Sequence, residues 1–150
     1  MKKISILTLL FLISNLTFSQ TKSETESWIK SFISTYSNAT ITFQNGILTH
    51  ENPFDPIGLH MKGSVSIKEL SSVKISGGTK GHTAIYLSCY QGDCVDDGFK
   101  STDESFQSFK NNKLSIQMNS EISEELQKRI EKALNHLIKL YGGKVLDNTF

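Results

Sequence analysis

The sequence has little arginine and little excess charge, and both shortages limit what the chain can bind. Arg129 is the only arginine among 150 residues, and arginine is the residue best suited to clamp a phosphate or carboxylate with two hydrogen bonds. A site built on several arginines is therefore excluded. The net charge of +1 lacks the basic excess of nucleic-acid-binding domains, and no polybasic cluster is present to attract an anionic membrane.

The motifs of common catalytic sites are also missing. No serine stands in a Gly-x-Ser-x-Gly turn, and no His-Glu-x-x-His pair occurs. The glycine-rich segment 77–81 contains a lysine but lacks the spacing and the ending of a phosphate-binding loop. We therefore predict no catalytic residue, no cofactor and no enzyme activity, although a small secreted enzyme of unfamiliar type remains an alternative.

The long apolar run of the chain lies at its start and resembles an export signal. Two lysines precede the run 4–16, and Thr17 and Ser19 place small residues at positions −3 and −1 of a cleavage site before Gln20. The run is shorter than the ~20 apolar residues of a membrane span, and no cysteine follows the cleavage site to carry a lipid. We predict a signal peptide over residues 1–19 and one exported domain over residues 20–150, periplasmic or extracellular.

Patterns of period two predict an antiparallel sheet structure. Residues 39–44 and 47–52 flank Asn45-Gly46, the dipeptide that favours a two-residue hairpin turn. This loop would place Phe43 opposite Leu48 and Ile41 opposite His50. Five further strands are predicted over residues 57–67, 73–75, 82–90, 94–99 and 113–118, whereas the polar segment from Lys100 to Asn112 is predicted as a loop.

Patterns of helical spacing predict one helix at each end of the sheet region. The first covers residues 21–36, where Ser23 and Glu26 form a capping-box pattern, and the second covers about 121–141 and ends at two glycines. The first helix carries an aromatic stripe that favours core packing. A role in gating a cavity for a hydrophobic ligand or lipid is the alternative, with three ligand-facing candidates: Trp28, Phe32 and Tyr36.

The order of these elements resembles the pleckstrin-homology-like superfold. A four-strand meander over 39–76, a three-strand meander over 82–118 and a closing helix form its barrel of two orthogonal sheets, so the resemblance implies an α+β fold. Certain small exported bacterial proteins of unknown role are similar in their early Trp28-Ile29 helix, a cysteine on a late strand and a helix ending like 133–138. The superfold hosts many functions and implies none of them here.

The two cysteines are expected to form a structural disulfide. Cys89 and Cys94 flank a four-residue turn, and an oxidising compartment would favour their bond. Two free thiols or a redox pair are the alternatives. We predict no metal site, because the acidic residues between 93 and 104 do not match a calcium-binding loop. Convergence of His50, His60 and His82 from their separate strands on a metal ion is the alternative.

These observations favour an exported, non-catalytic binding or interaction domain whose ligand is a protein or a small molecule. The loops 53–56 and 77–81 are the candidate binding segments, because binding residues concentrate on loops held by a rigid scaffold. The carrier and the unfamiliar enzyme described above remain the alternatives.

Overall fold

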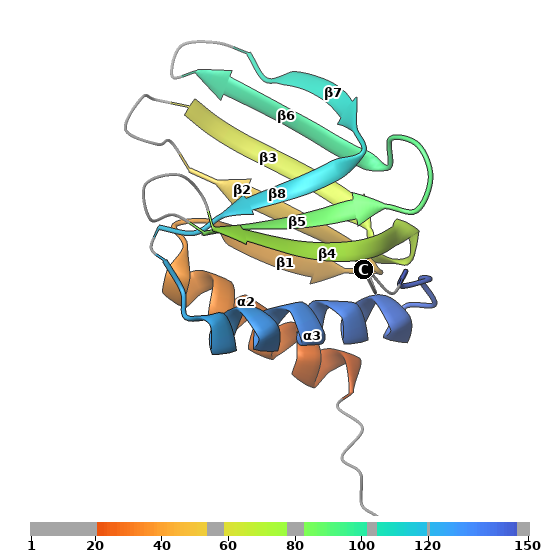
Figure 1. Ribbon diagram of the computed structural model, residues 1–150. Coiled ribbons are helices and arrows are strands. Elements are labelled where there is room, and N and C mark those ends of the chain that lie inside the picture. The colour runs from red at the N-terminus through yellow and green to blue at the C-terminus, as the bar shows by residue number, and fades with distance from the viewer. Residues whose placement is uncertain (1–20, 54–58, 78–82, 102–104, 120, 147–150) are drawn as a thin grey trace, which may run out of the picture.

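A computed structural model describes residues 21–53, 59–77, 83–101, 105–119 and 121–146 of the chain. The signal-peptide region, His82 and most of the two candidate loops lie outside these residues. The elements run in this order (Figure 1): α2 (Lys22–Tyr36), β1 (Thr40–Gln44), β2 (Ile47–Asn52), β3 (Leu59–Ser66), the short 3-10 helix η1 (Ile67–Glu69), β4 (Leu70–Gly77), β5 (Thr83–Cys89), β6 (Val95–Ser101), β7 (Gln107–Asn111), β8 (Lys113–Gln117) and α3 (Glu124–Leu140).

The eight strands form two antiparallel sheets. The larger sheet has the strand order β1-β2-β3-β6-β7, and the smaller has the order β4-β5-β8. The predicted α+β fold with a helix before and after the strands is therefore confirmed. The prediction was wrong in three details: the described strands do not close into a barrel, β3 pairs with β6 rather than continuing a meander into β4, and β7 lies in the segment that was predicted as a loop.

The first hairpin has the predicted register because its turn residues adopt the conformation that the turn requires. Asn45 has φ 52° and Gly46 has φ 78°, the left-handed values of a type I′ turn. The cross-strand neighbours are those expected from a two-residue loop, with Phe43 opposite Leu48 and Ile41 opposite His50.

Both helices begin at side chains that cap their free backbone N–H groups. Thr21 accepts a hydrogen bond from the Glu24 amide at 3.2 Å, and the Glu24 carboxylate accepts from the Thr21 amide at 2.8 Å. This capping box replaces the predicted pair of Ser23 and Glu26. The second helix is capped by Ser123, and its chain turns away at Gly142, where φ is 81°.

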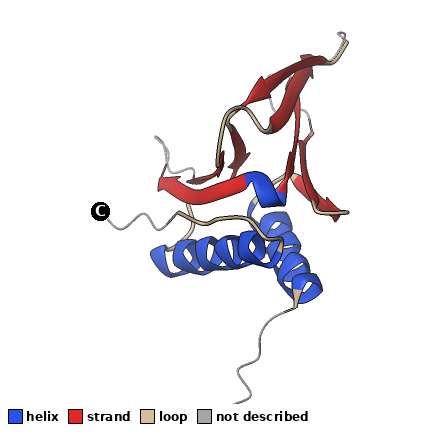
Figure 2. Cartoon of the chain, turned by 90° about the vertical axis from the view of Figure 1, so that its right-hand side faces the viewer, coloured by secondary structure: helices blue, strands red, loops and turns tan. Residues whose placement is uncertain are grey.

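The two helices lie together on one side of the sheets (Figure 2) and cover them. Helix α2 packs against β1 and α3, whereas α3 packs against β4 and η1. The tyrosine that follows α3, Tyr141, donates a hydrogen bond to Glu26 of α2, and this bond raises the pKa of Tyr141 to about 12. No helix among the described residues is long and apolar enough to cross a membrane.

A continuous apolar core fills the space between the helices and the two sheets. Its centre is made of aliphatic side chains with almost no exposed surface, which include Ile29, Ile33, Ile41, Leu48, Ile67, Leu70, Ile85, Leu87, Leu114, Ile116, Met118 and Ile130. The smaller sheet crosses the larger one at Gly63, where an added Cβ would lie 2.4 Å from Leu114 Cδ1 of β8. Glycine at this position lets the two sheets approach closely.

Candidate functional site

Strand β7 forms an outer edge of the five-stranded sheet and is the most exposed strand of the fold. Of the described strands, only β6 pairs with it. Residues 107–110 are all exposed, and Asn111 is half-buried. Figure 1 shows β6 and β7 at the side of the molecule opposite the two helices. We refer to β7 together with Phe99, Phe106 and Phe109 as the aromatic edge.

Phe109 lies on the inner face of the sheet, which it shares with the core. Directly opposed residues share a face, and Phe109 lies opposite Asp97, which in turn lies opposite Gly63. Phe109 is 45 % exposed, because β8 crosses the sheet at Gly63 and the strands beyond this crossing receive less cover. The ring centroids of Phe99 and Phe109 are 6.1 Å apart in an edge-to-face arrangement, so the two rings form an apolar surface on this face.

Phe106 lies just before β7 and packs on the other face. An added Cβ on Gly98 would lie 2.3 Å from Cε1 of Phe106 and 2.7 Å from the carbonyl oxygen of Gln107, so the missing side chain makes room for this ring. The His60 ring meets the Phe106 ring edge-on, with centroids 6.0 Å apart. His60 Nε2 lies 2.8 Å from Glu51 Oε1, and this contact orients the His60 ring. Phe106 nevertheless remains 38 % exposed.

The charged side chains beside Phe109 are already engaged by neighbouring groups. Lys110 is the only charged residue of β7 and lies 2.6 Å from the Asp96 carboxylate of β6. The Asp97 carboxylate accepts hydrogen bonds from the Gly98 amide at 2.9 Å and from the Asn111 side-chain amide at 3.4 Å. Lys110 and Asp96 thus neutralise each other, and the phenylalanine rings are the apolar part of an otherwise polar edge.

This edge lacks the features that usually prevent a sheet edge from pairing with another chain. Such features include proline, a β-bulge, several charges or a covering helix, and β7 has no proline and one charge. The other edge of the same sheet, β1, packs against α2, and the β4 edge packs against α3. Among the described strands only β6 pairs with β7, so the outward-facing backbone groups of residues 107–110 can accept an additional strand.

The three aromatic residues predicted as ligand-facing form a ladder along α2. The ring centroids of Trp28 and Phe32 are 5.4 Å apart, and those of Phe32 and Tyr36 are 4.8 Å apart. Phe32 is only 6 % exposed and belongs to the core, and Trp28 and Tyr36 are half-buried against it. Arg129 of α3 lies 5.7 Å from the Trp28 ring. The ladder joins the two helices, and its role in ligand binding stays a prediction.

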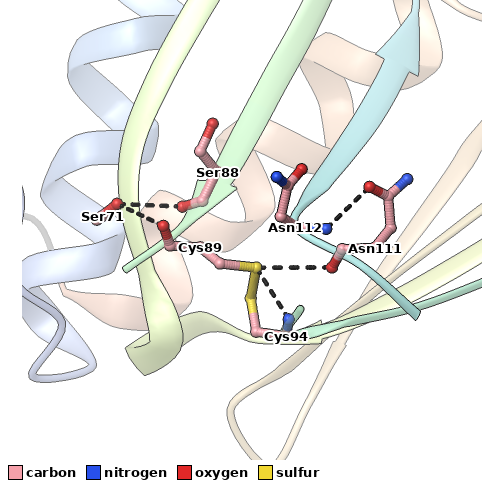
Figure 3. The surroundings of a disulfide bond; sticks show 6 residues. All are labelled: Ser71, Ser88, Cys89, Cys94, Asn111 and Asn112. Atoms are coloured by element: carbon pink, nitrogen blue, oxygen red, sulfur yellow. Dashed lines mark hydrogen bonds between the residues drawn. A yellow bond between two sulfur atoms is a disulfide. The ribbon is translucent and has the colours of Figure 1, made fainter. Parts of the chain in front are cut away.

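The predicted disulfide is confirmed, but its position differs from the expected hairpin. Cys89 and Cys94 are bonded with a Cα–Cα distance of 5.8 Å. Cys89 ends β5 of the smaller sheet and Cys94 precedes β6 of the larger sheet, so the bond joins the two sheets (Figure 3). The Cys94 amide lies 3.1 Å from Cys89 Sγ, and the Cys89 amide donates to the Asn112 carbonyl at 2.9 Å.

The described histidines do not assemble a metal site. His50 is 4 % exposed, and its Nε2 atom has no hydrogen-bond partner among the described residues. Burial lowers the pKa of its imidazole to about 4. His60 lies on the outer face with Glu51, and His82 is outside the described residues. No group of three or more potential ligands gathers among the described histidines, cysteines and acidic residues.

The aromatic edge was missed in the sequence because it falls in the segment predicted as a polar loop. The available signal was the pair of phenylalanines at 106 and 109. Residues at an odd spacing point to opposite faces of a strand, so this pair indicates an extended segment with an aromatic ring on each face. The structure places them around β7, whereas the predicted candidate loops lie mostly outside the described residues.

Comparisons with known proteins give no relative for this chain. No family model matches the sequence. No curated protein is similar to it, and no solved structure matches its fold. The functional argument therefore rests on the sequence and structure of this chain.

Proposed function

We propose that this protein is an exported, non-catalytic interaction module that binds an extended protein segment as an additional strand beside β7. The observation that carries this proposal is the exposure of the aromatic edge: Phe109 is 45 % exposed and Phe106 is 38 % exposed, and both border an edge strand with one charge.

An edge strand binds an extended segment through its backbone. The unpaired N–H and C=O groups of β7 would provide affinity, and contacts with alternate side chains would provide selectivity. Aromatic rings contribute large contact areas in such interfaces. Phe109 presents its ring on one face of the sheet and Phe106 on the other, so a bound strand would meet an apolar contact on either side.

The charge around the edge indicates the kind of segment that fits. Lys110 is already paired with Asp96, and Asp97 is occupied by hydrogen bonds from Gly98 and Asn111. A strongly acidic or strongly basic partner segment would therefore meet no unpaired opposite charge in β7. The favoured partner is therefore a segment with little net charge that places an apolar residue beside Phe109.

Export is supported by the signal-like first nineteen residues and by the disulfide. Disulfides persist in oxidising compartments and are rare in the cytosol. Mass spectrometry of the protein from a producing cell should give a chain that begins near Gln20. A full-length protein retained inside the cell would contradict the proposed location.

A displayed library of random peptides tests the binding mode. We expect the wild-type protein to enrich unstructured peptides that carry an apolar residue and little net charge, and we expect Phe109→Lys to reduce their binding. Ile47→Lys is the matched control, because Ile47 is 40 % exposed but lies at the turn end of the β1–β2 hairpin. Equal binding by both variants, or the absence of enriched peptides with a protein that sediments as a monomer, would contradict the proposal.

A further inference from the structure

We infer that the strand which pairs with β7 is β7 of a second copy of this chain, in an antiparallel arrangement with twofold symmetry. This inference rests on the proposed function, since it names the partner of the same edge. The pairing would join two five-stranded sheets into one continuous sheet. It follows from the order of side chains along β7 and from the position of β7 in the fold.

The sequence of β7 is complementary to itself in one register. Residues that face each other in an antiparallel pair interact directly, and like charges directly opposite are destabilising. A pairing centred on Phe109 places no charge opposite another charge. Its opposed pairs are Gln107 with Asn111, Ser108 with Lys110, and Phe109 with Phe109 of the second copy.

Registers shifted along β7 bring less favourable side chains opposite each other. In a twofold-symmetric pair both sheets present the same face to the same side, and opposed residues share a face. The central residue of the pairing must therefore face its own copy. A pairing centred on Lys110 would place the two lysines opposite each other, and one centred on Ser108 would place Lys110 against Phe106. Only the register centred on Phe109 combines an aromatic pair with separated lysines.

The arrangement of the layers leaves room for the second copy. Both helices lie at the side of the molecule away from β7 (Figure 1), and they pack against β1, β4 and η1. Two copies joined through β7 would therefore keep their helices at opposite ends. Phe99 and Phe109 of both copies would line one face of the junction, which lengthens the apolar surface on that face.

Cysteine cross-linking tests the register directly. We expect Phe109→Cys to form a disulfide-linked dimer under mild oxidation, because the residue would face its own copy. Neither Gln107→Cys nor Asn111→Cys should cross-link by itself, whereas a mixture of the two proteins should. Tyr90→Cys is a control at an exposed position of similar accessibility, 44 %, which should not cross-link efficiently. Peptide mapping must show that the bond between Cys89 and Cys94 is intact.

Sedimentation of the unmodified protein provides the second measurement. We expect a reversible monomer–dimer equilibrium, and we expect Phe109→Lys to weaken it by at least about tenfold because two lysines would then face each other. A wild-type protein that remains monomeric up to its solubility limit would overturn the inference, as would equal cross-linking at Phe109→Cys and Tyr90→Cys.

These outcomes are distinct from the failure of the proposed function. A monomeric protein that still enriches peptides in a Phe109-dependent manner retains the proposed function and excludes the second copy as the partner. A monomeric protein that enriches no peptide contradicts both.

Discussion

His50 should make the stability of this protein depend on pH in the acidic range. The residue is 4 % exposed, and no described residue hydrogen-bonds to its Nε2 atom. Burial disfavours the charged imidazole and lowers the pKa from 6.5 to about 4, although the carboxylates of Asp97 and Glu51 act in the opposite direction. The folded protein therefore keeps His50 neutral under conditions in which the unfolded chain protonates it.

The sign and size of the effect follow from proton linkage. Above pH 6.5 the imidazole is neutral in both states and contributes no pH dependence. Between pH 6.5 and about 4 the unfolded chain binds a proton that the folded protein does not, so the free energy of unfolding falls as the pH falls. Each pKa unit corresponds to about 1.4 kcal/mol, so the full loss is about 3 kcal/mol and is complete below about pH 4.

Urea denaturation of His50→Leu beside the wild type isolates this contribution. The carboxylates are the same in the variant and the wild type. Subtracting the two free energies of unfolding therefore removes the carboxylate contribution to the pH dependence. We expect this difference to change by about 3 kcal/mol in favour of the variant between about pH 7.5 and about pH 3.5. His50→Gln is a second variant that does not titrate and should show the same change. A difference that stays constant with pH in both variants would refute the reasoning.

Two further predictions concern the junction between the sheets. Replacing Cys89 and Cys94 by serine should lower the free energy of unfolding by about 2 kcal/mol by the chain-entropy relation for such a short loop, and a denaturant curve that matches the oxidised wild type would contradict this. Gly63→Ala should cost about 1–3 kcal/mol through overpacking, because the added Cβ would lie 2.4 Å from Leu114 Cδ1. Adding Leu114→Val should recover part of that loss in a double-mutant cycle, and additive losses would show that the two side chains do not meet.

Local signals in the sequence were sufficient to predict the elements that depend on neighbouring residues. The Asn45-Gly46 dipeptide fixes both the turn and the register of the first hairpin, because a two-residue loop allows one pairing. The second helix is marked by its long apolar stripe. The capping box of the first helix was placed two residues too late, because the same spacing of a hydroxyl and a glutamate occurs at Thr21–Glu24 and at Ser23–Glu26.

Pairing between distant strands could not be predicted in the same way. The alternation in β3 shows which residues turn inward, but it does not show that β6 rather than β4 will lie beside it. For the same reason the bond between Cys89 and Cys94 was expected within one hairpin, although it joins two sheets.

Strand β7 was missed because it is exposed on both faces. A strand that buries one face shows apolar residues at every second position, and β7 has polar residues on either side of Phe109. Because β7 is exposed on both faces, it lacks the alternation of apolar residues that marks a strand. The same exposure makes it the candidate site. The sequence therefore contains the site residues, but only the sheet order reveals that they border a free edge.

The chain passes between the two sheets three times, after β3, after β5 and after β7. Neither sheet is therefore built from a contiguous stretch of sequence. During synthesis from the N-terminus, the smaller sheet lacks a member until Gln117 has been added, and α3 can cover β4 only afterwards. A nascent chain of this kind remains incomplete until nearly all of it has been made, so folding is delayed to the end of translation.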